Sequence, residues 1–224
     1  MLGSVVFCKA FLVDWDGTLL DTLPLKINNA VQLFSSRLDA CPDTVRASYR
    51  RNSGHPRREL FNRIAFDCVG HHLDAKQFDA LSRDFSEANI RTITANGMLR
   101  AHVRVALGAL RQKNCLLFVS SSASQGELLL LARHFGLESY FLEILGSRVG
   151  FSKGEEHTRY IATKYNIAHE KIAGVGDESH DVRLHRAAGI MAIGITGTEN
   201  RTTLLASGAD LVVDDLRELV AYAQ

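Results

Sequence analysis

Four groups of acidic, hydroxyl and lysine side chains stand out because each follows an apolar run of the chain. Carboxylates bind divalent cations and act as nucleophiles or as acid–base groups, while hydroxyls and lysine bind phosphate oxygens. Brought to one point, these side chains would form a site for phosphate chemistry. The groups are Asp14, Asp16, Gly17 and Thr18; Ser120, Ser121 and Ser122; Lys153; and Gly176, Asp177, Glu178, Ser179, His180 and Asp181.

Each group taken alone has a simpler structural explanation. A serine after a strand commonly caps the next helix, and a single lysine is usually a solvated surface charge. Aspartates before a helix act as caps, and an Asp-x-Asp-Gly-Thr run can form a turn. The order of the groups favours a site instead, because ligands of an open parallel sheet bind at the carboxyl ends of its strands.

Hydrophobic periodicity indicates which elements position these groups. The apolar run Val5–Val13 predicts a buried strand, and residues 21–96 repeat apolar side chains at helical spacing. After Gly97 strands and helices alternate, which predicts an α/β fold with a Rossmann-like, doubly wound parallel sheet. The predicted core is residues 1–20 and 97–224, and residues 21–96 form an inserted small helical bundle, the cap. Predicted strands are 115–119, 143–145, 172–175, 190–195 and 211–213; predicted helices are 101–112, 127–135, 155–165 and 181–188, with a short helix and a closing helix after them.

Composition excludes several classes of protein. The 224 residues include 26 Lys and Arg against 25 Asp and Glu, so no strong field attracts nucleic acid or an anionic membrane. Lys9 interrupts the apolar N-terminal run, which argues against a signal peptide, and no run reaches the length of a membrane span. Four widely spaced cysteines are typical of free thiols in a reducing compartment. We expect a cytoplasmic monomer or homodimer.

The order and spacing of the four groups resemble a known pattern. Asp14-x-Asp16-Gly17-Thr18, Ser120, Lys153 and Gly176-Asp177-x-x-x-Asp181 are similar to the four motifs of the haloacid dehalogenase-like hydrolase superfamily. An insertion just after the first motif resembles its helical-cap branch, typified by phosphoglycolate phosphatases. This resemblance covers nearly the whole chain and implies an Mg²⁺-dependent phosphatase that acts on a small phosphorylated metabolite.

The resemblance implies a role for each motif residue. Asp14 would be the nucleophile that forms an aspartyl-phosphate, and Asp16 would be the general acid and base. Ser120 would donate a hydrogen bond to the phosphoryl group, with Ser121 as the alternative in a run of three serines. Lys153 would neutralise charge on the phosphate and on Asp14.

Mg²⁺ is the cofactor that this resemblance implies. A phosphate dianion repels the Asp14 carboxylate, and a bound cation removes that obstacle. The implied protein ligands are Asp14, the backbone carbonyl of Asp16, and Asp177. Asp181 would orient bound water or Lys153 from behind the ligands.

The predicted cap carries the candidates for substrate binding. Residues 51–58, Arg-Asn-Ser-Gly-His-Pro-Arg-Arg, are similar to the specificity loop of the superfamily. Arg57 is the leading candidate because a guanidinium binds carboxylate or phosphate with two hydrogen bonds. His55 and Arg58 are the alternatives, together with Ser121 on the core side.

Three residues bear on whether the chain has another activity of this superfamily. Asp16 argues against a dehalogenase, whose leaving halide needs no proton, and against phosphonoacetaldehyde hydrolases, which resemble this chain at Trp15 but carry Ala next. Sugar phosphomutases carry a histidine ten residues after the second aspartate, where this chain has Lys26. A catalytically silent phospholigand-binding protein is the alternative from another class. Phosphoglycolate, sugar phosphates and nucleoside monophosphates all stay open as substrates, and hinges are expected near 20–22 and 95–97.

Overall fold

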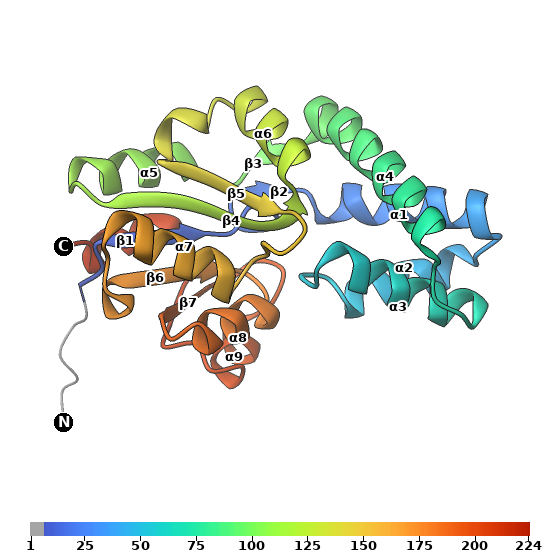
Figure 1. Cartoon of the computed structure of the whole chain (residues 1–224). Coiled ribbons are helices and arrows are strands. Elements are labelled where there is room, and N and C mark those ends of the chain that lie inside the picture. Colours follow the sequence, from blue (N-terminus) through green and yellow to red (C-terminus); the bar gives the residue numbers. More distant parts are fainter. Residues whose placement is uncertain (1–6) are drawn as a thin grey trace.

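A six-stranded parallel sheet forms the centre of one half of the molecule (Figure 1). This computed structural model describes residues 7–224. Strand β1 lies in the middle and is completely buried, as its sequence Ala-Phe-Leu-Val requires. The parallel sheet confirms the predicted α/β fold. In sheet order, the strands are β5 (Glu143–Ser147), β4 (Leu116–Ser124), β1 (Ala10–Val13), β6 (Ile172–Gly176), β7 (Met191–Ile195) and β8 (Leu211–Val213).

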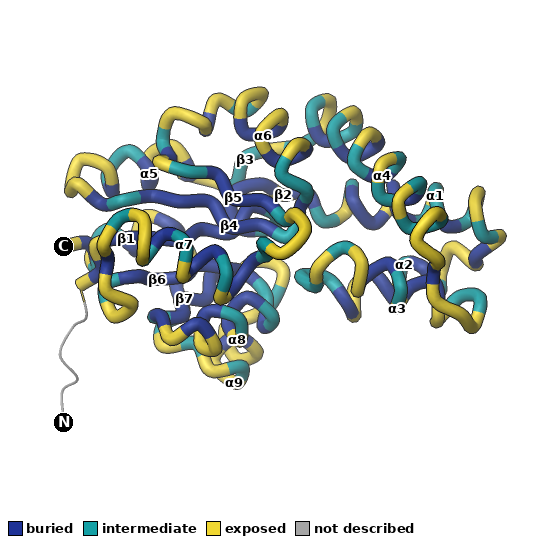
Figure 2. Tube along the Cα trace, viewed as in Figure 1, coloured by how far each residue is buried: buried dark blue, intermediate teal, exposed yellow. Residues whose placement is uncertain are grey.

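Helices cover both faces of this sheet, so its strands are the most deeply buried part of the core (Figure 2). Side chains alternate along a strand: Phe11 and Val13 pack on one face, and Ala10 and Leu12 pack on the other. The first face is covered by α5 (Val103–Gln112), α6 (Gln125–His134) and the 3-10 helix η3 (Leu216–Tyr222). The second is covered by α7 (Glu155–Tyr165), α8 (Ser179–Ala187) and α9 (Arg201–Ala206).

Four helices form the cap, which lies at one end of the sheet (Figure 1). They have a hydrophobic cluster of their own, in which Phe61 meets the rings of Phe34 and Phe85 edge-on at centroid distances of 5.2 Å. The division of the chain at residues 21 and 96 stays a prediction, and a separate cluster supports it. The cap helices are α1 (Leu23–Leu38), α2 (Pro42–Arg51), α3 (Arg57–Val69) and α4 (Ala75–Asn96).

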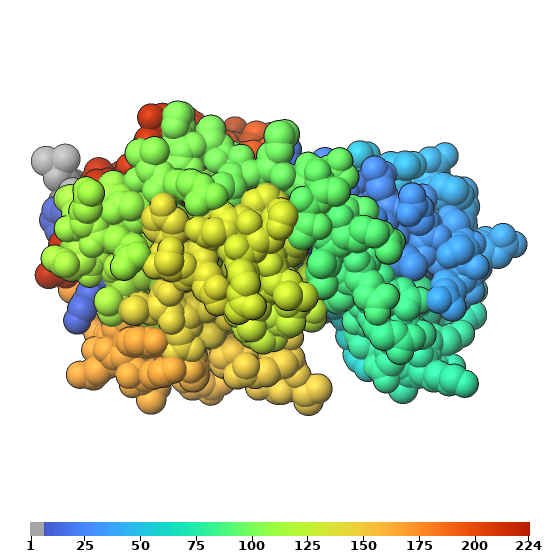
Figure 3. Space-filling model, turned by 90° about the horizontal axis from the view of Figure 1, so that it is seen from above, coloured from blue at the N-terminus to red at the C-terminus, as the bar shows by residue number. Residues whose placement is uncertain are grey.

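A short antiparallel ribbon joins the cap to the core. Its strands, β2 (Leu20–Asp21) and β3 (Met98–Leu99), are two residues each. Helix α4 also touches α6 of the core, and Figure 3 shows this contact beside a notch between the two halves. The ribbon and the contact of α4 with α6 therefore both join the cap to the core, and residues 53–55 add a third contact with β4 and α8.

Several elements differ from the sequence expectation. Strand β4 continues through the serines to Ser124 instead of ending at Val119, and the ribbon of β2 and β3 was not predicted. The first strand is confined to β1, with Cys8 in an isolated bridge, and Val5 and Val6 lie outside the described residues. The closing helix is the 3-10 helix η3; two further single-turn 3-10 helices are η1 (Glu138–Tyr140) and η2 (His169–Lys171). Among the described residues no helix is long and apolar enough to span a bilayer.

Candidate active site

The motif side chains meet at the carboxyl end of the sheet, where they border a cavity of about 70 Å³ beneath the cap. The core contributes Asp14 and Asp16 after β1, Ser121 from β4, Lys153 before α7, and Asp181 from α8. The cap contributes side chains from α1, α2, α3 and α4. Cap residues on the cavity wall are Leu23, Lys26, Tyr49, Ser53, Gly54, His55, Arg57, Leu60 and Phe85.

Gly17 allows the loop after β1 to pass close to Asp177. Its φ is +79°, and a Cβ at this position would lie 2.1 Å from Asp177 Oδ2. Thr18 Oγ1 donates a hydrogen bond of 2.9 Å to the other oxygen, Asp177 Oδ1. The first and fourth motifs are therefore held against each other by a glycine that no larger residue can replace without strain.

Lys153 lies between two buried carboxylates. Its Nζ is 2.5 Å from Asp14 Oδ1 and 2.6 Å from Asp181 Oδ1. Burial alone would lower the pKa of Lys153, but Asp14 and Asp181 outweigh it and hold that pKa above its ordinary value. Lys153 is therefore a permanently charged group beside Asp14.

The carboxylates carry more negative charge than Lys153 balances. Burial raises the pKa of Asp14 well above its ordinary value, against the attraction of Lys153, and the charges of Asp181 and Asp177 raise it further. Burial, followed by the charge of Asp181, raises the pKa of Asp177 to about 6. A cation placed among these groups would remove this excess of negative charge.

The donor set fits a divalent metal ion. One oxygen each of Asp14, Asp177 and Asp181 lies within 4.8 Å of the others. Asp177 Oδ2 is buried and has no hydrogen-bond partner among the described residues. In Asp181, Oδ1 contacts Lys153 and Oδ2 accepts from the backbone N–H of Glu178 at 3.3 Å. Hard oxygen ligands of this kind suit Mg²⁺ and Ca²⁺.

The three serines of the run have different surroundings. Ser120 lies beneath the site, with its Oγ 2.9 Å from His157 Nδ1, and does not line the cavity. Ser121 does line it, so the alternative serine faces the site. Strand β4 continues through the serines, but its pairing with β5 shifts register between Ser120 and Ser124, and Ser122 lines the cavity together with Ser121. Ser122 Oγ donates to the carbonyl of Gly54 in the cap at 3.0 Å.

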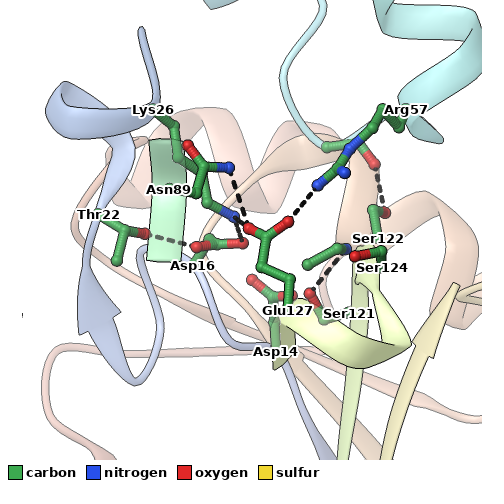
Figure 4. A network of polar contacts seen from close by, with 12 residues as sticks. Asp14, Asp16, Thr22, Lys26, Arg57, Asn89, Ser121, Ser122, Ser124 and Glu127 are labelled. Atoms are coloured by element: carbon green, nitrogen blue, oxygen red, sulfur yellow. Dashed lines mark hydrogen bonds and ion pairs between the residues drawn. The ribbon is translucent and has the colours of Figure 1, made fainter. Parts of the chain in front are cut away.

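Two residues at the start of α1 hold Asp16. Thr22 Oγ1 donates to Asp16 Oδ1 at 2.5 Å, and Lys26 Nζ is 2.5 Å from Asp16 Oδ2 (Figure 4). Thr22 precedes α1 but makes no side-chain cap hydrogen bond to it. Its hydroxyl instead donates to Asp16 in the loop after β1.

The predicted cap residues differ in where they lie. Arg57 lines the cavity and reaches Glu127 of α6 at 2.5 Å (Figure 4). His55 also lines it, with Nδ1 3.3 Å from Glu59 Oε1. Arg58 does not: its guanidinium lies 3.9 Å from the centre of the Phe78 ring and is half exposed. Helix α3 turns the Arg58 side chain outward, so this structure favours Arg57 and His55 over Arg58 as the residues that face a substrate.

Sequence reasoning missed Thr22 and Glu127. An acidic residue in the first turn of a helix is common for electrostatic reasons, so Glu127 gave no signal of its own. Lys26 stood out only as the residue that replaces the histidine of phosphomutases. The contact of Lys26 with Asp16 depends on the orientation of α1 relative to the core. No local sequence pattern predicts that orientation.

Comparison with known proteins identifies the family of this chain. Residues 11–195 match the model of the "Haloacid dehalogenase-like hydrolase" family. A phosphoglycolate phosphatase of Pasteurella multocida is 25% identical over 217 residues, covering 94% of this chain and 96% of that protein. "Probable phosphatase IndB" of Dickeya dadantii is 28% identical over 218 residues, covering 95% and 92%.

Solved structures show the same fold. A predicted phosphoglycolate phosphatase from Haemophilus somnus superposes with a TM-score of 0.83 at 20% identity, over 97% of this chain and 98% of that one. CbbY from Rhodobacter sphaeroides, solved in complex with phosphate, gives 0.76 at 19% identity, over 95% and 96%. The predicted resemblance, the capped α/β fold and the phosphatase class are confirmed. The chain belongs to the haloacid dehalogenase-like hydrolase family.

Proposed function

We propose that this protein is an Mg²⁺-dependent phosphatase that hydrolyses a small phosphate monoester through an aspartyl-phosphate on Asp14. The observation that carries the proposal is the setting of Asp14. One of its oxygens is held by Lys153, and the partnerless oxygen of Asp177 lies in the same carboxylate cluster, beside a small cavity. A small phosphorylated metabolite suits a cavity of this size.

In the first half-reaction the Asp14 carboxylate attacks phosphorus and the bond from phosphorus to the ester oxygen breaks. Asp16 donates a proton to that oxygen, so that an alcohol leaves. Lys153 and the Ser121 hydroxyl stabilise the charge on the phosphoryl oxygens. Thr22 and Lys26 keep the Asp16 carboxyl turned toward the cavity.

In the second half-reaction water attacks phosphorus and gives its proton to Asp16. The bond from phosphorus to Asp14 breaks, inorganic phosphate leaves, and both aspartates return to their starting states. The closed cap keeps bulk water away from the first step. Mg²⁺, held by Asp14, the backbone carbonyl of Asp16 and Asp177, would neutralise the repulsion between Asp14 and the phosphate dianion.

An aryl phosphate tests the proposal, because its hydrolysis needs no specific fit to the cap. We expect turnover by the wild type in Mg²⁺, loss of turnover in EDTA, and loss in Asp14→Asn. A rapid acid quench of the wild type should add one phosphoryl group to the peptide that contains Asp14. Glu143→Gln is the matched control: Glu143 bonds Tyr160 and Tyr165 away from the cavity and should leave the rate unchanged.

The same experiment separates the two alternatives. A silent binding protein would bind phosphate esters but release no inorganic phosphate from any of them. A phosphomutase would transfer the phosphoryl group between hydroxyls of one sugar faster than to water. Either result would overturn the proposal.

A further inference from the structure

Glu127 is a buried carboxylate of the core whose polar partners all belong to the cap. Arg57 Nη2 lies 2.5 Å from its Oε2, and Asn89 donates to its Oε1 at 2.9 Å (Figure 4). Ser86 also donates to Oε2, at 2.9 Å. Lys26 Nζ is 3.8 Å from the same Oε1. The Glu127 side chain is 0% exposed. A carboxylate buried this completely is stable only while its cationic partners stay in place.

Glu127 is charged at neutral pH. Burial alone would raise the pKa of its carboxyl, but the positive charges of Arg57 and Lys26 outweigh burial and hold the pKa below its ordinary value. The contact with Arg57 is therefore an ion pair, and the positive charge of the guanidinium is neutralised by the core.

Other groups of the cap also hold the Arg57 guanidinium. Its Nη1 donates to Ser86 Oγ at 2.5 Å and to the carbonyl of Ser82 at 3.3 Å, and the guanidinium lies 5.1 Å from the centre of the Phe85 ring. Only 11% of the side chain is exposed. Arg57 lines the cavity, but its charge is already paired with the buried carboxylate of Glu127.

The other cations on the cavity wall are paired as well. Lys26 lies against Asp16 and Glu127, and Lys153 lies against Asp14 and Asp181. The rest of the wall supplies apolar side chains and the hydroxyls of Tyr49, Ser53, Ser122 and Thr198.

We propose that Glu127 determines the substrate class by neutralising Arg57, so that the protein selects phosphate monoesters whose alcohol part is uncharged and hydroxyl-bearing. The inference rests on the proposed phosphatase function. A carboxylate on the alcohol part would have to share Arg57 with the buried Glu127, and like charges in a closed cavity repel strongly. A hydroxylated alcohol brings no charge of its own, and the hydroxyls on the wall can donate hydrogen bonds to it and accept them from it.

Two esters that differ only in this charge test the proposal: 2-phosphoglycolate, which ends in a carboxylate, and 2-hydroxyethyl phosphate, which ends in a hydroxyl. We expect the wild type to show kcat/KM about tenfold or more higher on the hydroxyl ester, the size of one hydrogen bond to a charged group. Glu127→Gln frees the charge of Arg57 and should shift this ratio about tenfold or more toward phosphoglycolate, chiefly through KM.

A double variant shows whether the effect of Glu127→Gln comes from the change in charge or from damage to the fold. Glu127→Gln combined with Arg57→Gln again leaves no net charge at this place, and its ratio should return toward that of the wild type. Glu127→Asp keeps the charge and should keep the preference for the hydroxyl ester, and Glu143→Gln controls for loss of a carboxylate elsewhere. A wild type that prefers phosphoglycolate, or a ratio that Glu127→Gln leaves unchanged, would overturn the inference.

The outcome is distinct from failure of the proposed function. If the wild type hydrolyses neither the aryl phosphate nor either ester, the phosphatase proposal fails. Dissociation constants of both esters, measured by calorimetry on Asp14→Asn with and without Glu127→Gln, then still decide the charge inference. Tighter binding of phosphoglycolate than of the hydroxyl ester to Asp14→Asn alone would contradict it.

Discussion

Ser120 and Ser121 are neighbours in the chain, but their hydroxyls have different surroundings. One hydroxyl contacts buried His157, and the other borders the cavity. We expect Ser121→Ala to lower kcat/KM by about tenfold or more, because a hydrogen bond to a charged phosphoryl group is lost. Ser120→Ala should retain turnover and lower the free energy of unfolding by about 1 kcal/mol, because His157 loses its partner. Steady-state kinetics and urea unfolding of both variants check this, and the reverse pattern would restore Ser120 as the phosphate ligand.

His157 makes stability depend on pH. Burial, together with the charge of Lys153, lowers its pKa from 6.5 to about 4. The unfolded chain therefore binds a proton at this residue below pH 6.5 while the folded chain does not, so stability falls as pH drops from 6.5 to 4. The contribution is about 3 kcal/mol over that range. Urea unfolding at several pH values should show a shallower loss in His157→Gln, and equal slopes would contradict the assignment.

At the scale of single elements, the loop after β1 depends on Gly17. Gly17→Ala places a Cβ against Asp177 Oδ2 at a positive φ, so we expect a loss of more than about 1 kcal/mol of stability and weaker Mg²⁺ binding. Gly108→Ala is the matched control, because this glycine lies inside α5 with open space around it. That substitution should stabilise the protein by about 0.5–1 kcal/mol. Thermal unfolding and titration of activity with Mg²⁺ distinguish them; equal effects would mean that the close approach to Asp177 is unimportant.

Secondary-structure elements also determine which site residues could be predicted from the sequence. Asp14, Lys153 and Asp177 could be predicted because each follows an apolar run, and a parallel sheet brings the ends of such runs together. The surroundings of Ser120 were less predictable because local composition indicates that the strand ends at the first serine, whereas β4 continues to Ser124 and its pairing with β5 shifts register after Ser120. Strand pairing depends on residues far apart in the chain, so a short stretch of sequence does not predict it.

The cap side of the site was less predictable for a similar reason. The direction of Arg58 depends on the rotation of α3 against α4, where its guanidinium meets the Phe78 ring. The contact of Arg57 with Glu127 joins residues 70 positions apart. Helical periodicity identifies which residues form a face, but the packing of one helix on another decides what that face meets.

At the scale of the whole molecule, the proposed cycle requires the cap to move so that product can leave. Ser86 of α4 and Ser124 at the end of β4 lie across the boundary with their Oγ atoms 3.3 Å apart. Ser86→Cys with Ser124→Cys places two thiols where a disulfide can form. We expect the oxidised double variant to lose turnover and a reductant to restore it. A Cys41→Ser background removes an exposed thiol, and each single variant is a control. Full activity in the oxidised form would show that the cap works without opening.

The composition of the boundary between cap and core has a thermodynamic consequence. The cap has its own hydrophobic cluster, and the contacts that close it on the core are largely ion pairs and hydrogen bonds: Arg57 with Glu127, Lys26 with Asp16, and Ser53 with Glu178. Separating such surfaces hydrates charges and exposes little apolar area. Opening should therefore carry almost no change in heat capacity, in contrast to unfolding. The enthalpy of opening would then be nearly independent of temperature, so the logarithm of the ratio of open to closed forms should vary linearly with reciprocal temperature.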